Sequence, residues 1–268
     1  MNQSTHKETV IAGGCSFTYG NELSDDFGKT YSLNTWSSGL SQSMASNYFC
    51  VAKGGLGNSG IARRVFDYIS NNNDENPVVV IMWSFLSRYD WAMARNSNLE
   101  HTRWATITPW DTALRVNEVE KTIGNSEPVM KEFKRRQDLY NETGIGAFAD
   151  SLYKHAANEY HEAYLSWKSI VWLQNILEKR KIPFMFTLAD NSLFYDTNKP
   201  LWKEDQLLTA LYNEIDFTRW FSFGDRMMGF NQWAKLNEYE YATTHPLDEA
   251  HRDAVKLMKG KFEECLKR

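Results

Sequence analysis

A serine stands where the sequence turns sharply out of an apolar run. Residues 10–12 are apolar, Gly13 and Gly14 follow them, and Ser16 comes two residues later. Paired glycines let the backbone turn tightly and leave the serine side chain exposed at the end of a predicted strand. Ligands of open α/β sheets bind beyond the carboxyl ends of the strands, so Ser16 stands where chemistry is expected. A serine in such a turn also commonly does no more than cap a helix.

Three further polar features stand at comparable points of the chain. A glycine-rich turn at 54–60 follows a second predicted strand, Ser84 follows a third, and the pair His245-Pro246 precedes the last predicted helix. If helices alternate with the strands, all of these lie at one edge of a parallel sheet. Acyl transfer by a serine needs this kind of set: a nucleophile, a base that takes its proton, and donors where the oxyanion develops.

The elements that must position these residues follow a regular order. Residues 77–83 form a continuous apolar run, which indicates a strand that is covered on both faces. The alternation of strands and amphipathic helices favours a three-layer α/β/α fold around a central, mainly parallel sheet. The predicted strands are 7–12, 50–52, 77–83 and 182–189, and the predicted helices are 35–49, 61–69, 151–181, 201–215 and one that closes the chain.

Residues 85–150 interrupt this rhythm. They are rich in Asn, Thr, Arg and Trp, show weak periodicity and contain Pro109 and Pro128. A connection of this length is uncommon in a compact domain. The sequence therefore predicts one domain over 1–268 with a helical and irregular insertion at about 85–150, which forms a lid or wall over the site.

The sequence resembles the SGNH (GDSL-like) hydrolases at both ends. Their first block, Gly-Asp-Ser-(Leu/Phe)-Thr-x-Gly, is matched by residues 14–20, and their Ala-x-x-Gly-x-x-Asn-x-x-Ile block is similar to residues 52–61. Their last block is similar to His245-Pro246 followed by Ala250-His251. The resemblance covers about residues 8–90 and 240–268. It implies a flavodoxin-like three-layer fold.

The resemblance also implies a role for each matched residue. Ser16 is the nucleophile, and its own backbone N–H is one oxyanion donor. Gly55 supplies a second backbone donor, and His245 is the general base. His251 is the competing base, but it falls inside the last helix, where a histidine more often packs. Asn58 either braces the glycine-rich turn or helps to bind the oxyanion.

Three departures from the family pattern bear on activity. Cys15 replaces the aspartate that precedes the nucleophile. Residues 82–85 replace the Gly-x-Asn-Asp block, so only the Ser84 hydroxyl remains there as an oxyanion donor. No aspartate stands two or three residues before His245, which leaves open the group that orients it. Loss of one oxyanion donor costs roughly 10²–10³ in turnover.

Composition excludes several classes of partner. The chain has 268 residues and a formal net charge of −4, which argues against a nucleic-acid partner. The three scattered cysteines, Cys15, Cys50 and Cys265, form neither a disulfide framework nor a metal-ligand spacing. No apolar run reaches membrane-spanning length and the amino terminus lacks signal-peptide character. We expect a cytoplasmic protein without metal or cofactor, and the sequence leaves its oligomeric state open.

The leading hypothesis is a serine esterase of the SGNH type that acts on a small or carbohydrate-linked ester. One alternative, indicated by the missing asparagine and aspartate, is a non-catalytic binding or structural protein on the same scaffold. The first block is similar to that of uncharacterised phage and bacterial proteins, which favours a virion or host-interaction role for such a protein. Another is an acyltransferase that uses the same residues. Arg88, just past the third predicted strand, either binds an anionic group of the substrate or forms a surface ion pair.

Overall fold

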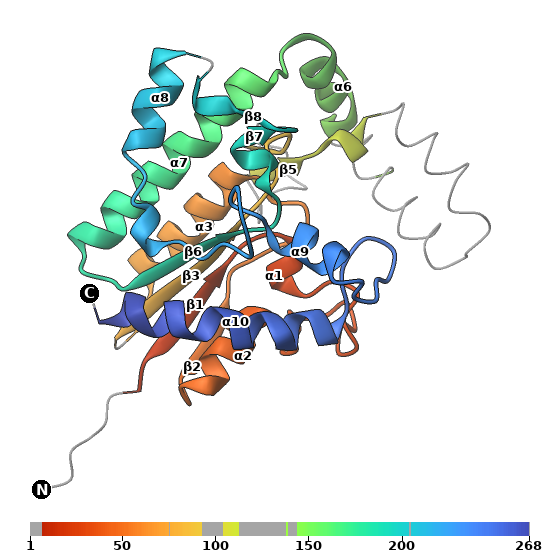
Figure 1. Cartoon of the computed structure of the whole chain (residues 1–268). Coiled ribbons are helices and arrows are strands. Elements are labelled where there is room, and N and C mark those ends of the chain that lie inside the picture. Colours follow the sequence, from red (N-terminus) through yellow and green to blue (C-terminus); the bar gives the residue numbers. More distant parts are fainter. Residues whose placement is uncertain are drawn as a thin grey trace, which may run out of the picture.

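The computed structural model describes residues 7–74, 76–92, 104–112, 138, 144–203 and 205–267 (Figure 1). Most of the insertion expected at 85–150, namely 93–103, 113–137 and 139–143, lies outside the described residues. The division of the chain into one domain with an insertion therefore stays a prediction.

The centre of the fold is a parallel sheet of four strands. It consists of β1 (Thr9–Gly13), β2 (Asn47–Cys50), β3 (Pro77–Trp83) and β6 (Phe184–Leu188), in the order β2-β1-β3-β6. Beyond β6, Trp220 makes a single parallel bridge to Phe186. All four strands end at the same edge, as the sequence predicts for the residues that follow them.

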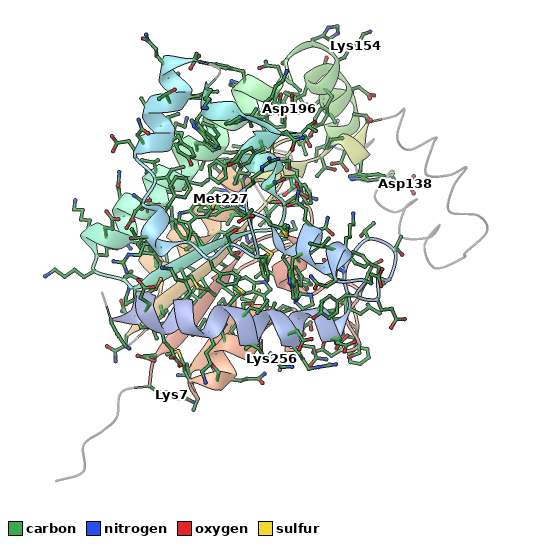
Figure 2. All side chains as sticks on the ribbon, viewed as in Figure 1. Lys7, Asp138, Lys154, Asp196, Met227 and Lys256 are labelled. Atoms are coloured by element: carbon green, nitrogen blue, oxygen red, sulfur yellow. The ribbon has the colours of Figure 1, made fainter. Side chains whose placement is uncertain are left out.

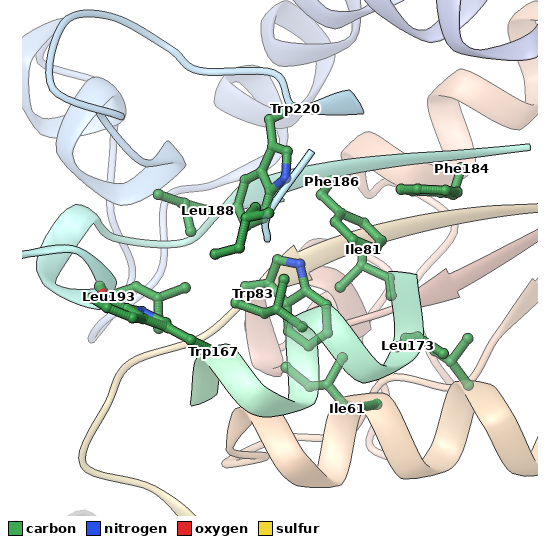
Figure 3. Packing of buried hydrophobic residues seen from close by; sticks show 14 of the residues in the cluster. Ile61, Ile81, Trp83, Trp167, Leu173, Phe184, Phe186, Leu188, Leu193 and Trp220 are labelled. Atoms are coloured by element: carbon green, nitrogen blue, oxygen red, sulfur yellow. The ribbon is translucent and has the colours of Figure 1, made fainter. Parts of the chain in front are cut away.

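Alternate strand residues enter two different helix layers, which makes the fold a three-layer α/β/α sandwich. Ile11, Ile81 and Phe186 pack in a cluster with α3 (Asn58–Asn71), α7 (Glu159–Lys179) and α8 (Gln206–Asn213) (Figure 3). Val10, Val80 and Met185 face α2 (Trp36–Ser43), α9 (Phe230–Leu236) and α10 (Asp248–Leu266). The predicted fold class is confirmed. Figure 2 shows side chains filling the space between the sheet and both helix layers.

Several predicted elements are wrong in extent. The helix predicted over 201–215 is a 3-10 helix, Leu201–Lys203, followed by the shorter α8, and the strand predicted over 50–52 is β2, which ends at Cys50. The helix predicted over 35–49 ends at Ser43, and the next residues cross into β2 through Ala45, which has a φ of 53°. Tyr48 fits the helical spacing, but it pairs with Val10 in the sheet. Local periodicity cannot reveal that pairing, because it depends on β1, which is distant in sequence.

The helix predicted over 151–181 is two helices. α6 (Ile145–His155) and α7 are separated at Asn158, whose side chain accepts a hydrogen bond from the His161 N–H at 2.9 Å and caps α7. α6 packs against a hairpin that the sequence did not predict, β4 (Tyr89–Ala92) paired antiparallel with β5 (Trp104–Ile107). The described part of the expected insertion thus begins as a hairpin.

The remaining elements are short. They are the helix α1 (Ser16–Tyr19), the two-residue strands β7 (Tyr195–Asp196) and β8 (Lys199–Pro200), and the 3-10 helices Pro109–Asp111, Asn191–Leu193, Leu201–Lys203 and Phe217–Arg219. Of the helices among the described residues, none combines the length and apolar character needed to cross a bilayer.

Candidate active site

Ser16 is the first residue of α1, and only Gly14 and Cys15 separate it from the carboxyl end of β1. Gly14 makes this turn possible, because a Cβ there would lie 2.1 Å from the Thr18 Oγ1. Cys15 precedes the helix in an extended conformation, and its side chain is fully buried in the core. The tight turn therefore buries Cys15 and presents Ser16, which is 8% exposed, at the sheet edge.

His245 meets this serine from the other end of the chain. Its Nε2 lies 2.8 Å from the Ser16 Oγ, although 229 residues separate the two. The loop before α10 holds the ring, with a hydrogen bond of 3.0 Å from the Ala242 N–H to the His245 carbonyl. The Phe17 ring packs 4.8 Å from the imidazole, centre to centre. The structure thus brings together the nucleophile and base that the sequence nominated.

A third side chain, Glu22, completes the arrangement, and sequence reasoning missed it. Its Oε2 lies 2.7 Å from the His245 Nδ1 and also accepts the backbone N–H groups of Thr244 and His245 at 3.1 and 3.2 Å. A carboxylate only accepts hydrogen bonds, so Nδ1 must carry the proton. Nε2 is then free to accept the hydroxyl proton of Ser16.

Glu22 is held in its charged form. Partial burial alone would raise the pKa of Glu22, but hydrogen bonds from His245 and Thr244 outweigh this effect and lower the pKa below its ordinary value. The carboxylate is therefore ionised around neutral pH. A fixed negative charge at Nδ1 stabilises the imidazolium that forms when Nε2 takes a proton.

The loop that carries Glu22 is fastened by other carboxylates. Asp26 accepts the Glu22 N–H at 2.9 Å, and the φ of Glu22 is 68°. Asp248, in the first turn of α10, accepts the Ser24 hydroxyl at 2.6 Å and the Asn34 side-chain N–H at 2.8 Å. These hydrogen bonds connect the loop after α1 to the start of α10. They therefore hold Glu22 close to His245.

The glycine-rich turn lies beside Ser16. The Lys53 N–H donates to the Gly14 carbonyl at 3.3 Å, so the turn after β2 is joined to the turn after β1. Gly55 has a φ of 80°, which suits glycine best. A Cβ on Gly55 would lie 3.5 and 3.6 Å from the Thr106 and Thr108 methyl groups. The hairpin β4–β5 and the residues after it thus pack against the turn.

Asn58 and Ser84 form a buried brace behind this turn. The Asn58 Nδ2 donates to the Ser84 carbonyl at 3.2 Å and to the Ser166 hydroxyl at 3.0 Å, and its Oδ1 accepts the Ser84 N–H at 2.7 Å. Both amide hydrogens of Asn58 are therefore already engaged. The Ser84 Oγ accepts a hydrogen bond from Arg88 at 3.0 Å and is fully buried. Of the two roles open to Asn58, these contacts favour bracing.

His251 does not join the serine. It lies inside α10, is 1% exposed, and its Nδ1 accepts the Trp36 N–H at 3.1 Å. Burial lowers the pKa of His251 to about 3, so the ring is neutral at ordinary pH. Within the described parts of the chain, no group of three or more His, Cys, Asp and Glu side chains is arranged to hold a metal ion.

A signal for Glu22 did exist in the sequence, but it was weak. The absence of an acid near His245 requires the orienting group to come from elsewhere, and the loop 21–34 holds several carboxylates close to the nucleophile. Spacing alone does not choose among Glu22, Asp25 and Asp26. The choice depends on a backbone turn with positive φ, which residue type does not reveal for glutamate.

No family model matches the chain, and no curated protein matches it either. Among solved structures, it is similar to a lipolytic protein of the G-D-S-L family from Veillonella parvula, at 11% identity over 97% of this chain and 99% of that chain, with a TM-score of 0.44. A protein described as a G-D-S-L lipolytic protein, from Desulfitobacterium hafniense, matches at 11% identity over 94% and 98%, with a TM-score of 0.44. An acetyl xylan esterase from Butyrivibrio proteoclasticus matches at 9% identity over 97% and 64%, with a TM-score of 0.42. Likenesses this weak carry no conclusion about function, which must come from the geometry of the site.

Proposed function

We propose that this protein is a serine hydrolase of esters, with Ser16 as nucleophile, His245 as general base and Glu22 as the group that orients His245. One observation carries the proposal: the Ser16 Oγ, the His245 ring and the Glu22 carboxylate form a continuous hydrogen-bonded series of 2.8 and 2.7 Å. A nucleophile bonded to a base that is itself oriented by an acid is the arrangement that serine acyl transfer requires.

The reaction proceeds in two halves. Nε2 of His245 takes the hydroxyl proton while the Ser16 Oγ bonds to the ester carbonyl carbon, which gives a tetrahedral oxyanion. The imidazolium then returns the proton to the alcohol oxygen, the carbon–oxygen bond breaks, and an acyl-serine remains. Water attacks that acyl group with His245 again as base, and the acid leaves with Ser16 restored.

Backbone groups supply the oxyanion site. The N–H groups of Ser16 and Gly55 are the donors, and they belong to turns that a hydrogen bond holds together. Asn58 keeps its amide hydrogens in the brace, and Ser84 is buried beneath it. A site with two donors rather than three is expected to turn over more slowly, by roughly 10²–10³.

The substrate we propose is a small or carbohydrate-linked ester, the class that the resemblance of the sequence blocks implies. Thr106 and Thr108, which belong to 85–150, pack beside Gly55, and this contact supports the proposal that 85–150 is an insertion shaping the site. The three cysteines are buried thiols, and we propose a cytoplasmic location. We propose no nucleic-acid, membrane, metal or cofactor partner.

Turnover of p-nitrophenyl acetate tests the proposal. Ser16→Ala should lower kcat by about 10³ or more, because the nucleophile is lost. Ser43→Ala, on the outer face of α2, is the matched control and should retain the full rate. Equal rates for the wild type and Ser16→Ala would overturn the proposal.

Labelling with a fluorophosphonate separates an enzyme from a non-catalytic scaffold. The probe should modify Ser16 in the wild type and fail to do so in His245→Gln, since the base must remove the hydroxyl proton. Absence of labelling in the folded wild-type protein would favour the binding or structural alternative.

A further inference from the structure

Arg88 is a half-buried cation that follows β3, with an unusual set of contacts. Its Nη1 donates to the buried Ser84 Oγ at 3.0 Å, and its Cζ lies 4.7 Å from the centre of the Phe85 ring. These contacts fix the guanidinium in place but do not neutralise it. A hydroxyl and an aromatic face both leave the positive charge uncompensated.

No carboxylate pairs with Arg88 among the described residues. Asp90, two residues along the chain, pairs instead with Arg63 at 2.7 Å. Glu162 accepts the Tyr89 hydroxyl at 2.9 Å, and Asp111 accepts the Thr108 N–H at 2.7 Å. The ion pair that the sequence allowed for Arg88 is thus absent from the described part of the chain. Its Nε and Nη2 groups make no hydrogen bond there.

Arg88 is connected to the candidate active site through its backbone and through a series of aromatic rings. A Cβ on Gly57 would lie 2.3 Å from the Arg88 carbonyl oxygen, so Arg88 packs directly on the turn that holds Gly55. On its other side, the Phe85 ring packs 6.2 Å from Phe17, which in turn contacts His245. The Arg88 backbone therefore packs on the glycine-rich turn, and its guanidinium stacks on Phe85, from which Phe17 leads to His245.

We propose that Arg88 binds an anionic group, a carboxylate or a phosphate, carried by the substrate. This inference rests on the proposed hydrolase function and narrows its substrate class to esters that bear a second, charged group. A guanidinium presents a planar set of donors that matches both anions, and its bonds to them are stronger than bonds between neutral groups. Phe85 and Ser84 hold the side chain in advance, which reduces the entropy lost on binding.

Binding to a catalytically silenced protein tests the anion site apart from catalysis. Ser16→Ala is titrated with p-hydroxybenzoate, with phenyl phosphate and with the neutral p-hydroxybenzamide, and each Kd is measured by NMR. At least one anion should bind more tightly than the amide. The anion that binds more tightly shows whether the substrate carries a carboxylate or a phosphate. Adding Arg88→Met should raise the Kd of that anion by about 10- to 100-fold and leave the Kd of the amide unchanged.

Two further variants keep the test specific. Arg88→Lys retains the charge without the planar donors and should give an intermediate Kd. Arg180→Met is the matched control, because Arg180 also stacks on a phenylalanine, Phe66, but bonds to the Ile69 carbonyl near the end of α3. The Arg180 variant should bind the anion as the parent does.

Turnover then connects the anion to the reaction. Wild type and Arg88→Met are compared on p-acetoxybenzoate against p-acetoxybenzamide, and on the p-nitrophenyl monoester of adipic acid against p-nitrophenyl hexanoate. In at least one pair, kcat/KM of the wild type should favour the anionic ester by about tenfold or more, and Arg88→Met should abolish the preference.

Three outcomes decide between the two proposals. Anions that bind no better than the amide, or a preference that survives in Arg88→Met, overturn the inference. Equal loss of turnover on neutral and charged esters, with anion binding unchanged, also overturns it. Anion binding that depends on Arg88 without turnover of any ester supports the anion site and instead contradicts the proposed function.

Discussion

The two sides of the candidate site differ in whether their polar side chains lie near the surface or are buried and fully hydrogen-bonded. On the acid side, formed by residues 21–34 and 244–248, carboxylates converge at the surface and Glu22 reaches His245 at 2.7 Å. On the oxyanion side, formed by the turn 54–60 with Ser84, the amide of Asn58 is buried and fully bonded within the fold. In the proposed mechanism, side chains on the acid side exchange protons, and backbone N–H groups on the oxyanion side bind the oxyanion.

This difference shows where the chain has departed from the family pattern it resembles. The acid expected just before the proposed base is absent, and Glu22, from the loop after the proposed nucleophile, contacts His245 instead. The asparagine expected after β3 has no replacement at Ser84, whose backbone is held by the Asn58 brace instead. On the acid side, another part of the chain thus supplies the missing carboxylate. On the oxyanion side, the Asn58 amide stabilises the fold.

Glu22→Gln should produce the largest effect of those that probe this contrast. A neutral amide can donate to Nδ1 and so favour the tautomer that cannot accept the Ser16 proton. We expect turnover of p-nitrophenyl acetate to fall by about 10²–10⁴ with little change in KM. Glu238→Gln is the matched control, because Glu238 is a glutamate with a similar φ of 57° that is exposed to solvent. A Glu22 variant with the wild-type rate would remove Glu22 from the mechanism.

Asn58→Ala should act mainly on stability. Removing the amide leaves the Ser84 N–H and carbonyl without partners in the buried brace, which costs about 1–3 kcal/mol each. We expect a lower free energy of unfolding in urea and a turnover rate, corrected for the folded fraction, within a few-fold of the wild type. Ser166→Ala, which removes only one partner of Asn58, should destabilise less. If turnover instead drops by about 10²-fold or more at unchanged stability, Asn58 belongs to the oxyanion site.

The pH dependence of stability provides a second probe of the acid side. The folded-state pKa of Glu22 lies below its unfolded value, so its bonds to His245 and Thr244 contribute stability above the unfolded pKa. That contribution is lost as the pH falls through the folded pKa. The wild type should therefore have a larger free energy of unfolding than Glu22→Gln at about pH 6, and the difference should shrink toward about pH 3. A gap that stays constant over this range would contradict the assignment.

The sequence predicted the fold better than it predicted the site's connections. The apolar run of β3 and the glycine turns after β1 and β2 are local signals, and the structure places them as expected. Ser16 and His245 could be nominated because both occur in short recognisable blocks. The contact from Glu22 could not, since it depends on a loop that Asp248 fastens from the far end of the chain. Networks of this kind join residues that no local pattern relates.

Asp248→Asn should give the smallest effect and tests whether that fastening matters for rate. The variant keeps one acceptor oxygen but loses the charge, and its bonds to Ser24 and Asn34 weaken. Glu22 should then sample more positions, so kcat should fall less than the roughly 10²-fold that an ångström of misplacement costs, with KM unchanged. Asp253→Asn is the control on the same helix, because Asp253 bonds Tyr239 and Lys256 instead. The double variant Asp248→Asn with Glu22→Gln is then compared with Glu22→Gln alone. If Asp248→Asn lowers kcat in the wild type but not in the Glu22→Gln background, Asp248 acts through the position of Glu22.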